Sequence, residues 1–179
     1  MVLLAAGLGL WACAPSAPAP AIDGYEVPRR SWLPDDIPPR AVILGVHGFN
    51  DYSNAFDAFG TFAAEHGIAV YAYDQRGFGE TRSRGYWAGA DTLIDDCADA
   101  VCVLREAHPE IPLAVLGESM GGSVALAGIR SGQVNGVDRL ILAAPGVRGG
   151  VPLRQSGRRP DDIWRLIGLP DPMPATAAE

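Results

Sequence analysis

Short apolar runs and amphipathic stretches alternate along the middle of the chain. Four runs have the near-continuous apolar character of buried strands, at residues 41–46, 68–73, 111–116 and 138–144. A weaker strand-like segment precedes them at 25–33, and segments with helical periodicity separate them at 54–66, 91–107 and about 120–129. Phe56, Phe59 and Ala63 fall on one face of the first of these helices. The alternation predicts an α/β fold, a mostly parallel sheet with helices on both faces.

The segment 91–107 has the clearest helical period in the chain. Its apolar face is formed by six residues, Leu93, Ile94, Cys97, Ala100, Val101 and Leu104. Asp91 or Thr92 is the expected N-cap. Cys97 and Cys102 would lie about 7.5 Å apart along the helix axis, too far for an unstrained disulfide. We therefore expect both to be small core residues or unreactive thiols.

The N-terminal segment 1–20 differs from this alternation. Ten mostly apolar residues, small residues around Cys13 and an Ala/Pro-rich stretch resemble a bacterial lipoprotein signal with its tether. Two features depart from that pattern, because no basic residue precedes the apolar run and Trp11 is bulky for its position. We expect an exported protein, periplasmic or anchored to the membrane through lipidated Cys13. The alternative is an ordinary uncleaved apolar N-terminus, which would leave the protein cytoplasmic.

Composition narrows the possible functions. The chain has 179 residues, enough for one domain, and its 48% hydrophobic content supports a core. A net charge of -7 argues against nucleic acid as a partner, since no basic surface is available to replace counterions. The cysteines and histidines do not show metal-ligand spacing, so we expect no metal and no cofactor. The sequence leaves the oligomeric state open.

Residues 117–121 carry the candidate chemistry, with the G-x-S-x-G sequence GESMG between an apolar run and a helix. This setting is typical of a nucleophile elbow, a strained strand-to-helix turn that projects the hydroxyl of Ser119. Gly117 and Gly121 would be needed because a side chain there would collide with the neighbouring strand and helix. The alternative is a Gly/Ser turn that fits the pattern by chance.

Two further loops follow strands and can support such a serine. At the end of 41–46, His47 and Gly48 precede Phe49, whose backbone N–H and that of Met120 are the candidate oxyanion hole. The alternative for His47 and Gly48 is a plain turn. The second loop contains Asp74 and Arg76 beside glycines, and we expect an ion pair between them to brace the edge of the site.

Together, the three motifs resemble the α/β-hydrolase family. In order they are VHGFND at 46–51, DQRGFG at 74–79 and GESMGG at 117–122. The nearest branch is that of the lysophospholipases and monoacylglycerol lipases, and the likeness covers about residues 25–146. The resemblance implies a serine hydrolase acting on glycerolipid or related small acyl esters, with Ser119 as nucleophile and the amides of Phe49 and Met120 as oxyanion hole.

The chain also departs from the family pattern, in which an acid and then a histidine follow the serine on later loops. None of the three histidines follows Ser119. His66 and His108 precede strands and belong to the opposite edge of the sheet, and His47 belongs to the oxyanion loop. We therefore expect an incomplete α/β-hydrolase fold lacking the C-terminal strands. In that fold, 140–144 would be an exposed apolar edge prone to self-association.

Three functional interpretations remain open on these residues. The first is a serine ester hydrolase whose catalytic acid and histidine are not identifiable, so that this chain is inactive or weakly active. The second is a non-catalytic fragment or binding module on the same scaffold. The third is another reaction on that scaffold, such as amide cleavage or perhydrolysis. The corresponding division is a signal-like segment and tether at 1–20, a partial hydrolase domain at 21–146 and an irregular Arg/Pro-rich tail at 147–179. Out-of-frame coding sequence is one hypothesis for that tail.

Overall fold

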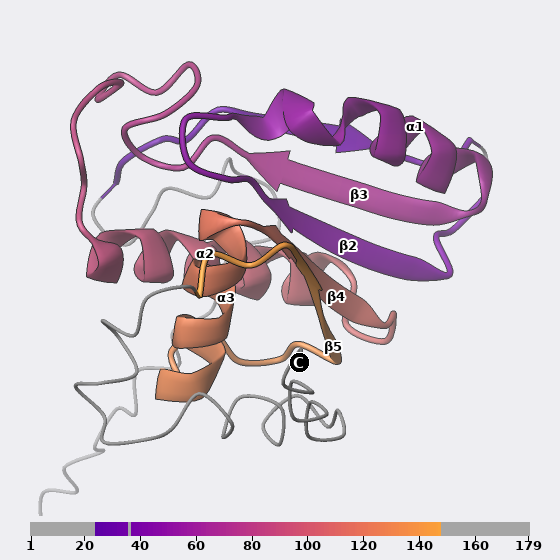
Figure 1. The fold of residues 1–179 in the computed structure, drawn as a ribbon. Coiled ribbons are helices and arrows are strands. Elements are labelled where there is room, and N and C mark those ends of the chain that lie inside the picture. Colours follow the sequence, from indigo (N-terminus) through magenta and orange to yellow (C-terminus); the bar gives the residue numbers. More distant parts are fainter. Residues whose placement is uncertain (1–23, 36, 148–179) are drawn as a thin grey trace, which may run out of the picture.

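The computed structural model describes residues 24–35 and 37–147 (Figure 1). The expectations for the signal-like segment, for lipidation of Cys13 and for nearly all of the tail fall outside these residues. Within them, no helix is long and apolar enough to span a bilayer.

One five-stranded sheet organises the described residues, in the order β1-β3-β2-β4-β5. The strands are β1 (Arg29–Trp32), β2 (Ala41–Val46), β3 (Ile68–Tyr73), β4 (Leu113–Glu118) and β5 (Arg139–Ala143). β1 runs antiparallel to β3, and the other neighbours are parallel. The register sets Val46 opposite Gly117 and Glu118 opposite Ala143, so β2, β4 and β5 end at the same edge. Loops that follow these strands therefore meet there.

The helices cover both faces of this sheet (Figure 1). They are the 3₁₀-helix η1 (Ser53–Phe56), α1 (Asp57–Glu65), α2 (Ala90–Ala107) and α3 (Met120–Ser131). α1 packs over β3 and β1, whereas α2 and α3 pack together on the opposite face. The larger hydrophobic core lies under α2 and α3, and a smaller one lies under α1. The predicted α/β fold class is confirmed.

Several predicted boundaries and faces differ from the structure. The run at 111–116 forms a strand only from Leu113, and the segment at 25–33 forms one only at 29–32. Phe59 is 38% exposed rather than in the core, because Gly60 occupies the inward position of α1 against Trp32. Gly89, at φ 95°, caps α2 in place of Asp91 or Thr92.

The two cysteines of α2 lie in different environments. Cys97 is a free, fully buried thiol, and burial raises its pKa to about 12. The prediction of an unreactive core thiol is confirmed for Cys97. Cys102 is exposed and disulfide-bonded, so the same prediction is wrong for that residue. The two do not bond to each other, as the helical spacing requires.

Candidate active site

Ser119 occupies the turn between β4 and α3 with a backbone conformation that few non-glycine residues adopt, φ 48° and ψ -113°. Such a conformation costs about 1–3 kcal/mol and persists only where surrounding bonds enforce it. Here the Ser119 N–H donates to the carbonyl of Ala143 at 2.9 Å, and the Ser119 carbonyl accepts from the Gly146 N–H at 2.7 Å. The end of β5 and the loop that follows it therefore hold the strained turn on both sides.

The glycines of this turn fill positions that have no room for a side chain. A Cβ on Gly121 would collide with the carbonyl groups of Val46 and His47 at the end of β2. A Cβ on Gly117 would lie 2.5 Å from the Cα of Gly122. The predicted steric need for Gly117 and Gly121 is confirmed, and it lets the first turn of α3 pack directly on the backbone of β2.

His47 holds the loop that faces this turn. Its side chain is fully buried, and its Nε2 accepts the Gln75 N–H at 2.9 Å. Because Nε2 is an acceptor, Nδ1 carries the proton and donates to the Gly48 carbonyl at 2.8 Å. Burial lowers the pKa of His47, which favours this neutral form. The Gln75 amide completes the link by donating to the His47 carbonyl at 2.6 Å.

Gly48 brings this loop against the nucleophile candidate. A Cβ on Gly48 would lie 3.3 Å from the Cβ of Ser119 and would collide with the Glu118 carboxylate. The next residue is Phe49, and Met120 begins α3 directly after Ser119. Across residues 24–35 and 37–147, the backbone amides of Phe49 and Met120 have no hydrogen-bond acceptor. Two amides near one serine are thus available to an oxygen that develops negative charge.

The predicted ion pair between Asp74 and Arg76 is wrong. Both residues are buried, but the Asp74 carboxylate accepts two backbone amides, from Ser53 at 2.8 Å and Glu80 at 2.7 Å. Arg76 instead makes a two-pronged ion pair with Asp96 on α2, with contacts of 2.8 to 3.1 Å. Both side chains still brace loops at the carboxyl edge of the sheet. The sequence signal that could have indicated Asp96 was an acidic residue among the apolar positions of a helix.

The other two histidines are bound away from Ser119. His66 caps α1, and its Nδ1 lies 2.8 Å from the Phe62 carbonyl. His108 follows α2, and its Nε2 lies 3.0 Å from the Tyr71 hydroxyl. Since His47 uses both ring nitrogens, none of the chain's histidines hydrogen-bonds Ser119. In the part of the chain that the structure describes, no cluster of His, Cys, Asp or Glu has the form of a metal site.

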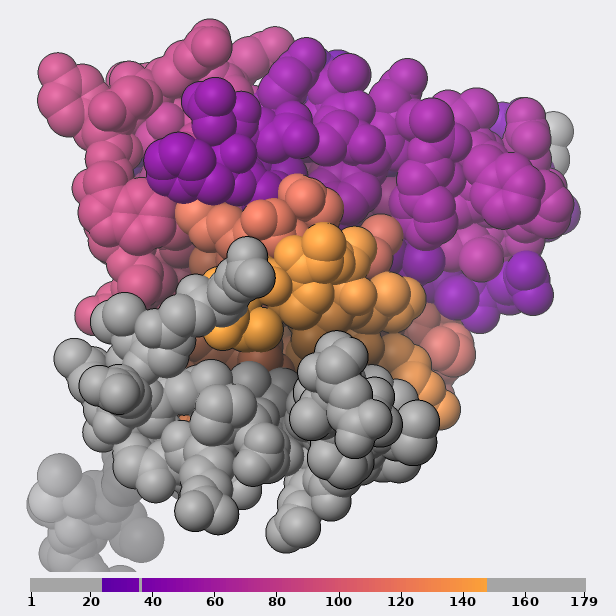
Figure 2. All heavy atoms as spheres, in the orientation of Figure 1, coloured from indigo at the N-terminus to yellow at the C-terminus, as the bar shows by residue number. Residues whose placement is uncertain are grey.

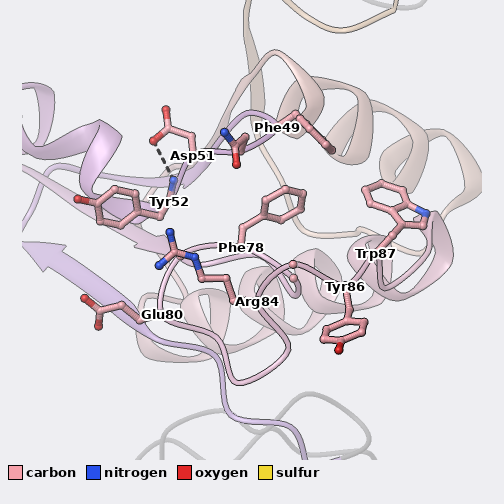
Figure 3. Close-up of a pocket in the computed structure, with 12 residues that line it drawn as sticks. Phe49, Asp51, Tyr52, Phe78, Glu80, Arg84, Tyr86 and Trp87 are labelled. Atoms are coloured by element: carbon pink, nitrogen blue, oxygen red, sulfur yellow. Dashed lines mark hydrogen bonds between the residues drawn. The ribbon is translucent and has the colours of Figure 1, made fainter.

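A cavity of about 590 Å³ opens beside the oxyanion loop (Figure 3). It lies between the segment around Phe49, which follows β2, and the connection from β3 to α2 that contains Tyr86 and Trp87. These two segments lie side by side at the surface, purple and pink in Figure 2. The sequence pattern does not predict this cavity, because the cavity forms between loops without regular periodicity.

Known proteins resemble the chain over most of this region. A profile of the family described as serine aminopeptidase, S33, matches residues 37–166, past the point near Gly146 where sequence analysis ended the likeness. A putative monoglyceride lipase of Schizosaccharomyces pombe is 34% identical over 124 residues, 66% of this chain and 32% of that protein.

Solved structures of lipases and esterases also resemble this chain. A soluble variant of monoglyceride lipase from Saccharomyces cerevisiae superposes with a TM-score of 0.61 at 27% identity, over 69% of this chain and 42% of that one. A carboxyl esterase from Bacillus coagulans gives 0.60 at 26%, over 68% and 41%. The chain thus spans less than half the length of each of these three relatives. The family profile, covering well over half of the chain, confirms the α/β-hydrolase resemblance: this chain belongs to the serine aminopeptidase S33 family of α/β-hydrolases.

Proposed function

We propose that this chain carries the nucleophile and oxyanion hole of a serine ester hydrolase, with Ser119 as the nucleophile. The supporting observation is the backbone of Ser119, strained at φ 48° and fixed by hydrogen bonds at both its amide and its carbonyl. Such backbone strain persists only where the surrounding structure imposes it, and strained residues of this kind are concentrated at functional sites. Ser119 is only partly buried at this turn.

The reaction would follow from the geometry. The Ser119 oxygen attacks the ester carbonyl carbon, and the carbonyl oxygen takes the negative charge. The amides of Phe49 and Met120 receive that oxygen, and removing one such donor in other enzymes costs about 2.7–4 kcal/mol. The bond between that carbon and the alcohol oxygen then breaks, and the alcohol leaves with the proton given up by the Ser119 hydroxyl. Water hydrolyses the acyl-serine, which releases the acid and restores the hydroxyl.

Removal of the proton from the Ser119 hydroxyl is the step that we expect to limit this reaction. A serine is a poor nucleophile at neutral pH unless an adjacent base accepts its proton. No histidine follows Ser119, and the three present are bonded elsewhere. We therefore expect slow acylation by this chain, supported by the oxyanion hole and substrate binding alone.

A fluorophosphonate probe tests both parts of this proposal. With the folded 179-residue chain, we expect slow covalent labelling of Ser119, mapped by mass spectrometry, and none in Ser119→Ala. Ser123→Ala is the matched control, because Ser123 lies one turn along α3 and should leave the labelling rate unchanged. A folded chain that never labels contradicts the role of Ser119. Labelling as rapid as in an ordinary serine hydrolase contradicts the missing base.

The substrate class rests on the relatives. Those quoted above are named as monoglyceride lipases and a carboxyl esterase, so we propose acyl esters, including lipid esters, for this chain. The family description also names aminopeptidases. Comparing hydrolysis of 4-nitrophenyl butyrate with that of an aminoacyl 4-nitroanilide separates the two, and we expect a rate above background only for the ester.

A further inference from the structure

The large cavity beside the oxyanion loop is unusually rich in exposed aromatic rings. Phe49 is 68% exposed, Tyr86 77% and Trp87 59%, and all three line this single cavity. Large apolar groups gathered at one surface hollow typically mark a binding site. Figure 3 shows the rings of Phe49, Phe78 and Trp87 gathered at one end of the cavity.

Phe78 forms a fixed floor for this end. It is only 9% exposed, and its backbone N–H donates to the Gln75 carbonyl at 2.9 Å. The Phe49 ring meets it edge-to-face at 5.3 Å, and the His47 ring does so at 5.8 Å. Aromatic rings prefer such edge-to-face or offset neighbours, so the open faces of Phe49 and Trp87 are suited to another ring.

Charge is confined to the other end of the cavity. In Figure 3, Asp51, Glu80 and Arg84 lie on the side of Tyr52, away from Trp87. Glu80 faces Arg30 at 3.6 Å, and the Asp51 carboxylate accepts the Tyr52 amide at 2.8 Å. The end between Phe49 and Trp87 is therefore suited to an uncharged group.

This aromatic end includes the side chain of the residue that follows Gly48 in the oxyanion loop. The backbone amide of Phe49 is an oxyanion donor of the proposed function, and its neighbour Gly48 packs against Ser119. A group attached to an ester carbonyl held there would extend along the Phe49 side chain into the cavity. We propose that the cavity is a subsite for an aryl group of the ester substrate, an inference that rests on the proposed function.

Binding of unreacted esters to Ser119→Ala tests the subsite. Methyl phenylacetate carries the ring on the acid side and benzyl acetate carries it on the alcohol side. Each is compared by NMR titration with the ester in which cyclohexyl replaces phenyl, a group of similar size without a π-face. We expect about twofold to tenfold tighter binding of at least one aryl ester, and its identity assigns the side. Equal or weaker binding of both aryl esters would overturn the proposal.

A variant pair locates the effect. Trp87→Leu keeps an apolar side chain but removes the ring, so the aryl preference should fall to about one. Phe62→Leu is the matched control, because Phe62 is 59% exposed on α1 and does not line the cavity. Retention of the preference in Trp87→Leu overturns the proposal. These titrations do not use the serine hydroxyl, so the two proposals can fail separately. An aryl preference without labelling of Ser119 refutes only the proposed function. Labelling of Ser119 without an aryl preference refutes only the subsite.

Discussion

The buried ion pair between Arg76 and Asp96 predicts a large loss of stability when one partner is changed. Arg76 is 8% exposed and Asp96 4%, and their contacts of 2.8 to 3.1 Å join the loop after β3 to α2. The Arg76 guanidinium also lies 4.5 Å from the centre of the Tyr25 ring. Breaking such a buried pair by changing one partner typically costs 3–5 kcal/mol.

Asp96→Asn isolates the charge because it keeps the shape of the side chain. We expect the free energy of unfolding to fall by about 3–5 kcal/mol. At about 2–4 °C per kcal/mol for a domain of this size, the melting temperature should fall by roughly 6–20 °C. Urea and thermal unfolding followed by far-ultraviolet circular dichroism measure both quantities.

Asp95→Asn is the matched control, since it is the same change at the next residue. Asp95 is only partly buried and accepts an exposed hydrogen bond from Gln133 at 3.0 Å, so we expect a change within about 0.5 kcal/mol. The double variant Arg76→Met/Asp96→Leu should lose less stability than Asp96→Asn, because it replaces both charges of the pair with apolar groups. A loss below about 1 kcal/mol in Asp96→Asn would refute this account of the pair.

Three further predictions follow from other contacts. Gly121→Ala should destabilise the fold and abolish labelling of Ser119, because the added Cβ meets the Val46 carbonyl; normal labelling would show that α3 can shift. Burial lowers the pKa of His47 below the ordinary histidine value near 6.5, so the unfolded chain binds more protons than the folded chain near and below that pH. Stability should therefore fall as the pH drops through 6.5, and the urea midpoints at pH 7.5 and 5.5 should differ less in His47→Gln than in the unmodified chain. Ile141→Lys should increase the monomer fraction in light scattering, since Ile141 is 43% exposed on β5, and a monodisperse unmodified chain would contradict this reasoning.

Local patterns were enough to predict most of the sheet. The runs at 41–46 and 68–73 match β2 and β3 because both strands are buried on both faces, which leaves a continuous apolar signal. β1 was harder to delimit, since it is an exposed strand at the edge of the described sheet, where it pairs with β3. Phe59 fitted the helical period of α1, but a glycine packed against Trp32 took the inward place, a tertiary contact that periodicity does not contain.

In the candidate site too, features set by neighbouring residues were predicted and contacts between distant segments were not. The motif at 117–121 predicted a strained turn, because the chemistry of that turn is local and demands small residues on either side. The partners of Asp74 and Arg76 could not be predicted in this way. The Asp74 carboxylate accepts backbone amides from η1 and from its own loop, and the Arg76 guanidinium pairs with an acid twenty residues further along the chain. Which charges pair depends on where loops meet after the sheet has formed.

The backbone conformation of Ser119 depends both on its neighbours in the sequence and on contacts with a distant strand. Its sequence neighbours allow the conformation, but the bonds that hold it come from Ala143 at the end of β5 and from Gly146 in the loop that follows. β5 in turn is an edge strand of the described sheet, paired there only with β4. The geometry of the proposed nucleophile is therefore only as stable as the pairing of β4 with β5. Whatever loosens that edge should relax Ser119 toward an ordinary backbone and lower its reactivity before the rest of the core unfolds.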